Sequence, residues 1–168
     1  MSIEWSLYEV RPVGRQRLVQ ATDRMANRLA GGSILDFTMS LASASRADDS
    51  ATFTSQVHVT CDGLPALVDI EAGPAIEDSR ELVERSDLLG TVSSRRSLLS
   101  VALGLIVAIA WLEQGGGELS GTGLGSAFVE ADVESLVVRF SAGQGNGKDG
   151  IEHLARRIVG DDARMNFA

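Results

Sequence analysis

Hydrophobic and polar residues alternate with period two in several segments of the chain, and this alternation predicts strands. Over residues 3–9, Ile3, Trp5 and Leu7 share one face and polar residues occupy the other, as in a half-buried strand. Three further segments show the same alternation: 35–42, 52–61 and 66–72. Because the connections between these three are short, and Asp62-Gly63 is a typical hairpin turn, we expect an antiparallel meander.

Other segments place their apolar residues at helical spacing. Residues 13–30 carry Leu18, Ala21, Met25 and Leu29 along one face, which predicts an amphipathic helix. We also expect a short acidic helix over 80–88, a long apolar helix over about 93–114 and a closing helix over 151–159. The last residues, after about 160, are expected to be frayed.

The apolar run over residues 98–112 is long enough to raise the question of a membrane span. Fifteen helical residues extend about 22 Å, which is shorter than the roughly 30 Å hydrocarbon core of a bilayer. Ser100, Gly104 and Ala108 recur every four residues and form a narrow face that allows close packing. We therefore expect a central core helix and no stable membrane insertion. The long apolar helix and the strand edges are also compatible with a homodimer.

The last third of the chain completes the predicted fold. Residues 127–133 and 136–141 are predicted to be strands on either side of a short turn. The whole chain, 1–168, is then a single α+β domain with a mainly antiparallel sheet and helices packed on it. After the first strand, the order of elements is similar to that of small acidic secretion chaperones, which is a resemblance of fold without a shared residue motif.

The negative charge of the chain is concentrated in one region. The formal net charge is -8, and the region between Ala47 and Gly90 contains ten acidic residues against two basic ones. A one-sided field of this kind attracts a basic partner and repels nucleic acid, so we expect no nucleic-acid binding.

The centre of this region supplies the candidate interaction site. Glu77, Glu81 and Glu84 stand at helical spacing, with Asp78 and Asp87 nearby. Such residues commonly form a solvated helix face, and the alternative is a docking surface for a basic protein. We take these five residues as the predicted partner-binding site.

Two features offer an alternative as a metal- or phosphate-dependent enzyme. Glu130, Asp132 and Glu134 would share one face of a strand, where three carboxylates can hold Mg²⁺ or Ca²⁺, although such a row is more often solvated. The glycine-rich loop from Gly143 to Lys148 resembles a phosphate-binding loop, but Asp149 stands where such loops carry a hydroxyl residue. A flexible turn is the simpler interpretation of this loop.

Nucleophilic catalysis has little support in the sequence. Cys61 and His58 fall on opposite faces of their predicted strand, so we expect Cys61 to be a small core residue. A single cysteine excludes an internal disulfide and suits a reducing compartment, and the first residues lack the pattern of a secretory signal. These features predict a cytoplasmic protein.

Taken together, these features predict a small acidic protein that is not an enzyme and has no cofactor. We expect it to bind a basic protein partner and to neutralise or escort it, as immunity proteins, antitoxins and secretion chaperones do. Electrostatic steering by the acidic surface would be followed by occlusion of a basic cleft on the partner.

Overall fold

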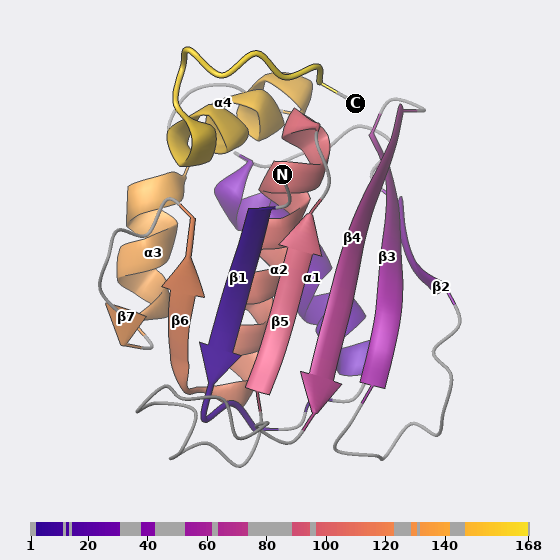
Figure 1. The fold of residues 1–168 in the computed structure, drawn as a ribbon, viewed down its shortest axis with the longest axis vertical. Coiled ribbons are helices and arrows are strands. Elements are labelled where there is room, and N and C mark those ends of the chain that lie inside the picture. Colours follow the sequence, from indigo (N-terminus) through magenta and orange to yellow (C-terminus); the bar gives the residue numbers. More distant parts are fainter. Residues whose placement is uncertain are drawn as a thin grey trace.

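The computed structural model describes most of the chain. The described residues are 3–11, 13, 15–30, 38–42, 53–61, 64–73, 89–94, 97–122, 129–130, 132–141 and 147–167. Within them the chain forms seven strands and four helices, which confirms the predicted α+β class (Figure 1).

The elements of the first half follow the predicted order. They are β1 (Ile3–Tyr8), α1 (Arg15–Leu29), β2 (Thr38–Ala42), β3 (Phe53–Cys61) and β4 (Leu64–Gly73). β2, β3 and β4 pair as an antiparallel meander, as their alternation predicts. The expected acidic helix over 80–88 lies outside the described residues.

The second half differs more from the prediction. Its elements are β5 (Leu89–Ser94), α2 (Leu98–Gly115), β6 (Glu118–Gly121), β7 (Val129–Glu130), α3 (Val133–Phe140) and α4 (Lys148–Val159). β5 and β6 were not predicted. The strand expected over 136–141 is wrong, because these residues belong mainly to α3. Of the strand expected over 127–133, Val129 and Glu130 form β7, but the expected end is wrong, because Asp132 caps α3 and Val133 begins it.

The seven strands form one sheet in which every pair of neighbours is antiparallel. Their order is β2-β3-β4-β5-β1-β6-β7, so the first strand of the chain lies inside the sheet. Trp5 illustrates this position, since it lies opposite Val92 of β5 and opposite Gly121 of β6. The Trp5 indole N–H donates to the Thr122 carbonyl at 3.2 Å, which satisfies the polar atom of this buried ring.

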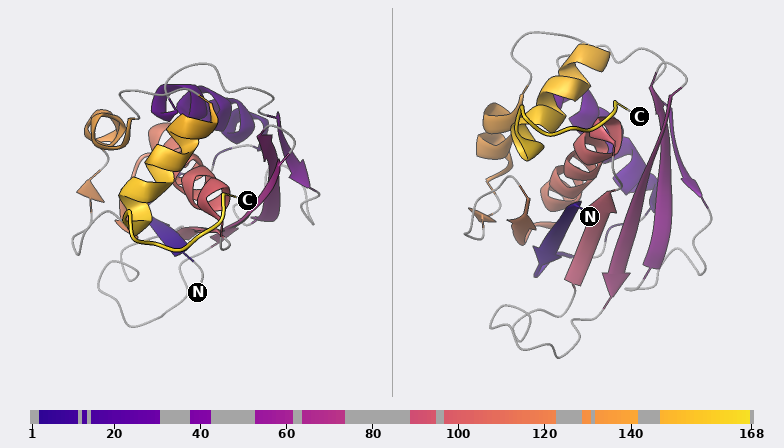
Figure 2. Two further views of the ribbon diagram at one scale, coloured as in Figure 1. Left: turned by 90° about the horizontal axis from the view of Figure 1, so that it is seen from above. Right: turned by 45° about the horizontal axis from the view of Figure 1, so that its top comes forward.

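Helix α2 is the centre of the core. Sixteen of its eighteen residues are buried, and it packs against β1, β4, β5 and β6 on one side and against α1, α3 and α4 elsewhere. Seen from above, the sheet lies on one side of α2 and α1 on the other, while α4 crosses the end where α2 begins (Figure 2). It is the one helix among the described residues that is long and apolar enough to cross a membrane, and it is buried as a core helix, as predicted.

A serine pair fixes the start of α2 against the sheet. The Ser97 hydroxyl accepts a hydrogen bond from the Ser100 N–H at 3.1 Å, which caps the first turn. The buried Ser100 hydroxyl in turn accepts one from the Leu67 N–H of β4 at 3.3 Å. A small residue is needed at position 100 because the helix backbone lies close to β4 there.

The chain after residue 160 is docked, so the expectation of a frayed end is wrong. Carbonyl oxygens of Asn166 and Phe167 accept hydrogen bonds from the first two N–H groups of α2. Arg156 donates to the Ala163 carbonyl at 2.6 Å, and Met165 and Phe167 pack against the core. The tail thus satisfies backbone donors that every helix leaves open at its first turn.

Candidate functional site

Charge is divided between the sheet and the helices. The seven described strands contain five acidic residues and no lysine or arginine. The acidic residues are Glu4, Asp69, Glu71, Glu118 and Glu130. By contrast, α1 contains four arginines against one aspartate. The sheet is therefore the acidic part of the described molecule and α1 its most basic element.

The acidic side chains of β1 and β4 lie on the face of the sheet that none of the four described helices covers. Trp5, Val68 and Ile70 are buried against α2, so their strand neighbours point the other way. Glu4 and Glu71 are exposed, and Asp69 is half-buried. In Figure 1 this face of the sheet is turned to the viewer, and α1 and α2 lie behind it.

The register brings these carboxylates close together. Glu4 and Asp69 both lie opposite Ser93 of β5, from its two sides, so they occupy one row across the sheet. Strands two positions apart are separated by about 10 Å, which is about one Debye length at 0.1 M salt. Their fields therefore add over a basic surface that approaches this face.

The predicted partner-binding residues fall in the part of the sequence between β4 and β5. Glu77, Asp78, Glu81, Glu84 and Asp87 lie outside the described residues. The two residues that flank their segment are described, because Gly73 ends β4 and Leu89 begins β5 as direct partners. The ends of β4 and β5 that flank this segment are therefore neighbours in the sheet, two residues from Glu71.

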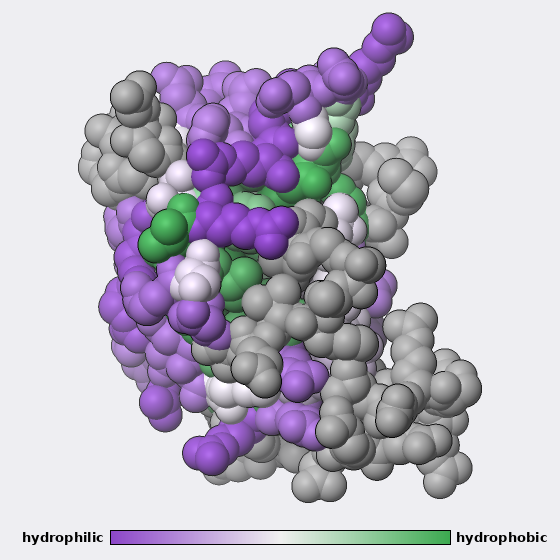
Figure 3. Space-filling model, turned by 90° about the vertical axis from the view of Figure 1, so that its left-hand side faces the viewer, coloured by the Kyte–Doolittle hydropathy of each residue, from purple (hydrophilic) through white to green (hydrophobic). Residues whose placement is uncertain are grey.

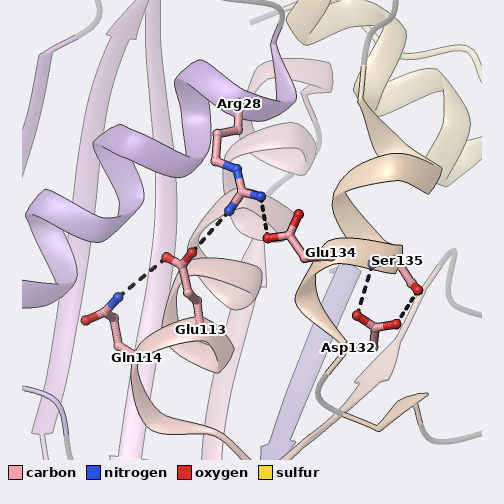
Figure 4. A network of polar contacts seen from close by, with 6 residues as sticks. All are labelled: Arg28, Glu113, Gln114, Asp132, Glu134 and Ser135. Carbon is pink, nitrogen blue, oxygen red and sulfur yellow. Dashed lines mark hydrogen bonds and ion pairs between the residues drawn. The ribbon is translucent and has the colours of Figure 1, made fainter.

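The opposite side of the molecule is held by a polar network (Figure 4). Arg28 of α1 donates to Glu113 of α2 at 3.1 Å and to Glu134 of α3 at 2.7 Å. Arg17 donates to Gln114 at 2.7 Å. These contacts join three helices. They also pair the only carboxylate of α2, which lies near the C-terminal end of that helix, with a cation.

The candidate metal row is not assembled by the fold. The strand on which it depended ends at Glu130, and Asp132 is the N-cap of α3, where it accepts hydrogen bonds from the Ser135 N–H and hydroxyl. Glu134 is bonded to Arg28. The structure shows no group of three His, Cys, Asp or Glu side chains that could hold a metal ion within its described ranges.

Hydrogen bonding to Ser135 shifts the pKa of Asp132. The Ser135 hydroxyl, and then the Ser135 N–H, hold the pKa of the Asp132 carboxyl below its ordinary value. Both contacts stabilise the ionised form. This shift therefore follows from helix capping rather than from a catalytic environment.

The glycine-rich loop is described only at its end. Residues 142–146 lie outside the described part, and Lys148 is the first residue of α4. Its ammonium lies 4.8 Å from the centre of the Phe167 ring, in a cation–π contact with the docked tail. A phosphate-binding loop needs that ammonium for its ligand, so the described contact favours a structural role.

Exposed apolar side chains are few among the described residues. The large ones are Leu64 on β4 and Val138 on α3, which is 75% exposed. The side that carries α3 is mainly hydrophilic, with hydrophobic residues visible in a strip between polar side chains (Figure 3). Charge is consequently the more extended recognition feature of the described surface.

Comparisons of this chain with protein-family models, with curated proteins and with solved structures found no match to any of them. Its function therefore has to be inferred from the residues and their placement. The absence of lysine and arginine from every described strand is the feature that sequence reasoning missed. It becomes visible only when the positions of the strands are known.

Proposed function

We propose that this protein binds a basic partner protein through its acidic sheet face and the acidic segment that joins β4 to β5. The observation that carries the proposal is that the described strands contain five acidic residues and no lysine or arginine. Binding would neutralise the partner, as an immunity protein or antitoxin does, or escort it, as a secretion chaperone does. Either role needs the same complementary surface.

The separation of acidic and basic residues between the sheet and α1 orients a charged partner as it approaches. With acidic residues on the sheet and arginines on α1, a basic protein is attracted to one side and repelled from the other. Such steering raises the association rate and weakens as salt is added. The strand pairing also holds this face of the sheet firmly, which suits contact with a folded partner.

An enzymatic function has less support. The carboxylates of the candidate metal row either bond to different partners or lie on different elements, and the Lys148 ammonium contacts the Phe167 ring. The alternative of a metal- or nucleotide-dependent enzyme can be tested by thermal shift with Mg²⁺, Ca²⁺, Mn²⁺ or ATP. A rise in the melting temperature with any of them would favour it.

The proposal is tested by capture from host lysate followed by binding kinetics with the captured protein. The variant Glu4→Lys/Glu71→Lys reverses two exposed charges of the sheet face, and Glu81→Lys/Glu84→Lys reverses two of the adjoining segment. We expect a basic protein to be captured at low salt and lost at high salt. Each reversal variant should slow its association at least tenfold and flatten the salt dependence.

A matched control is Asp149→Lys, which reverses an exposed charge on α4, away from the sheet. It should leave the association rate within about twofold of the unmodified protein, since only rim charges near an interface change it strongly. If the reversal variants associate as fast as this control, or if nothing is captured at either salt concentration, the proposal is wrong.

A further inference from the structure

The tail after α4 runs across the start of α2 (Figure 2). Its side chains alternate, since Ala163, Met165 and Phe167 are half-buried and the residues between them, Arg164 and Asn166, are exposed. Met165 and Phe167 pack against the hydrophobic core. One face of the tail is therefore held against the molecule by two large apolar side chains.

The two residues that follow Met165 supply the backbone cap of α2. The Leu98 N–H donates a hydrogen bond to the Asn166 carbonyl at 2.9 Å. The Leu99 N–H donates one to the Phe167 carbonyl at 2.8 Å. These N–H groups belong to the first two residues of the helix, where a helix offers no acceptor of its own. Their protection from solvent exchange therefore depends on the docked tail.

The other described contacts of the tail lie on either side of Met165. On the side of α4, Arg156 donates to the Ala163 carbonyl at 2.6 Å. On the side of the cap, the Lys148 ammonium lies 4.8 Å from the centre of the Phe167 ring. Met165 is thus the apolar contact that joins the anchored base of the tail to the cap of α2.

Met165 is also open to oxidation. Met25 is completely buried in the core, whereas Met165 is only half-buried. A peroxide transfers one oxygen atom to a thioether: a sulfur lone pair forms the S–O bond, the O–O bond breaks, and hydrogen peroxide is reduced to water. The sulfur loses two electrons and becomes a sulfoxide. A polar group then replaces the apolar sulfur that packs on the core.

From this placement we infer that Met165 is an oxidant-sensitive latch for the tail. Oxidation by a peroxide weakens the packing of Met165, and the tail leaves the start of α2. The Leu98 and Leu99 N–H groups then open to solvent. A thiol-dependent sulfoxide reductase reverses the change, because two thiols become a disulfide and the oxygen leaves as water.

Amide hydrogen exchange of ¹⁵N-labelled protein, before and after treatment with hydrogen peroxide, tests this inference. Peptide mass spectrometry reports which methionine gains one oxygen, and we expect Met165 to be oxidised well before Met25. Exchange of the Leu98 and Leu99 amides should become at least about tenfold faster. The Val101 N–H is the internal reference, because it donates to the Ser97 carbonyl within the first turn of α2 and should change by less than about twofold.

The matched control is Met165→Leu, which keeps an apolar side chain of similar volume and has no sulfur. After the same treatment it should retain slow exchange at Leu98 and Leu99, although Cys61 and the other methionines are still present. Met165→Gln places a polar side chain at this position without any oxidant. It should show fast exchange at the two leucines before treatment. Incubation of the oxidised protein with a methionine sulfoxide reductase and dithiothreitol should restore slow exchange.

Several results would each overturn the inference. One is oxidation of Met25 as fast as that of Met165. Another is unchanged exchange at Leu98 and Leu99 in protein that carries the sulfoxide. Equal acceleration at Val101 would indicate general loosening of the fold, and equal acceleration in treated Met165→Leu would place the sensitive group elsewhere.

Discussion

The backbone N–H of Leu99 donates a hydrogen bond of 2.8 Å to the carbonyl oxygen of Phe167. Together with the bond from Leu98 to Asn166, at 2.9 Å, this contact joins the tail of the chain to the start of the core helix. The side chain of Phe167 packs on the core and against the Lys148 ammonium. The tail is thus an integral part of the described fold.

Removal of residues 164–168 should destabilise the protein. Two backbone hydrogen bonds contribute about 0.5–1.5 kcal/mol each, and the partial burial of Met165 and Phe167 adds about 1 kcal/mol each. We expect the free energy of unfolding to fall by about 3–5 kcal/mol, measured by urea denaturation. Asn166→Ala keeps the backbone carbonyl and should change stability by less than about 0.5 kcal/mol. Equal stabilities for the truncated and full chains would contradict this role.

Period-two alternation and apolar content were enough to predict the meander and the core helix. β2, β3 and β4 alternate clearly, and the run within α2 is too apolar to face solvent. These features depend on residues close together in the sequence, which a single chain reveals. The tail's docking depends on a contact between residues 98–99 and 166–167, which local patterns do not encode.

The error at α3 has a specific cause. Its β-branched and aromatic residues favour a strand by composition. Their spacing, however, is helical, with Val133, Leu136, Val137 and Phe140 at i, i+3, i+4 and i+7. Asp132 followed by Ser135 is also a helix N-terminus pattern. In this segment the spacing of the apolar residues therefore predicts the structure better than their composition does.

β5 and the candidate interface were less accessible to sequence reasoning. β5 offers few apolar residues, with Val92 as its described core residue, and it is a strand because β1 and β4 bond to it from both sides. The predicted acidic residues 77–87 could be chosen from charge alone. The row formed by Glu4 and Asp69 could not, because it depends on pairing between distant segments.

The contact between α4 and the end of α1 makes a second prediction. A Cβ at the buried Gly150 would collide with the Ala30 carbonyl. Gly→Ala in a helix normally stabilises by up to about 1 kcal/mol, but here the collision should reverse the sign. We expect Gly150→Ala to lower the free energy of unfolding by about 1–3 kcal/mol in urea denaturation. The exposed neighbour Asp149→Ala should cost less than about 1 kcal/mol, and a stabilised Gly150→Ala protein would show that α4 does not pack as described.

The bridge from Arg28 to two other helices should contribute little, despite its central place in the network. The Arg28 side chain is 34% exposed and Glu134 is 75% exposed, so solvent screens both ion pairs. We expect Arg28→Gln to lower the free energy of unfolding by about 0.5–1 kcal/mol in low salt, and by less in 1 M NaCl. Arg24→Gln is the control and should have no effect at either salt concentration. A loss above about 2 kcal/mol for Arg28→Gln would mean that the network is more deeply buried than described.

The cap of α3 should be sensitive to acid in a defined direction. Because the pKa of Asp132 is lowered by its hydrogen bonds to Ser135, the ionised carboxylate stabilises the fold above the pKa that Asp132 has in the unfolded chain. This stabilisation is lost as the pH falls through the lower pKa of the folded state. Asp132→Ala should therefore be less stable than the unmodified protein at neutral pH, and the difference should disappear in acid below both values.

The measurement is the urea midpoint of both proteins from pH 7 downward, read at equal ionic strength. Asp132→Asn is the informative companion, because an asparagine side chain also caps helices but does not titrate. We expect Asp132→Asn to retain most of the stability at pH 7. Its urea midpoint should change less with pH, because the side chain at position 132 no longer titrates. A difference between Asp132→Ala and the unmodified protein that persists unchanged into acid would show that the ionised cap is not its source.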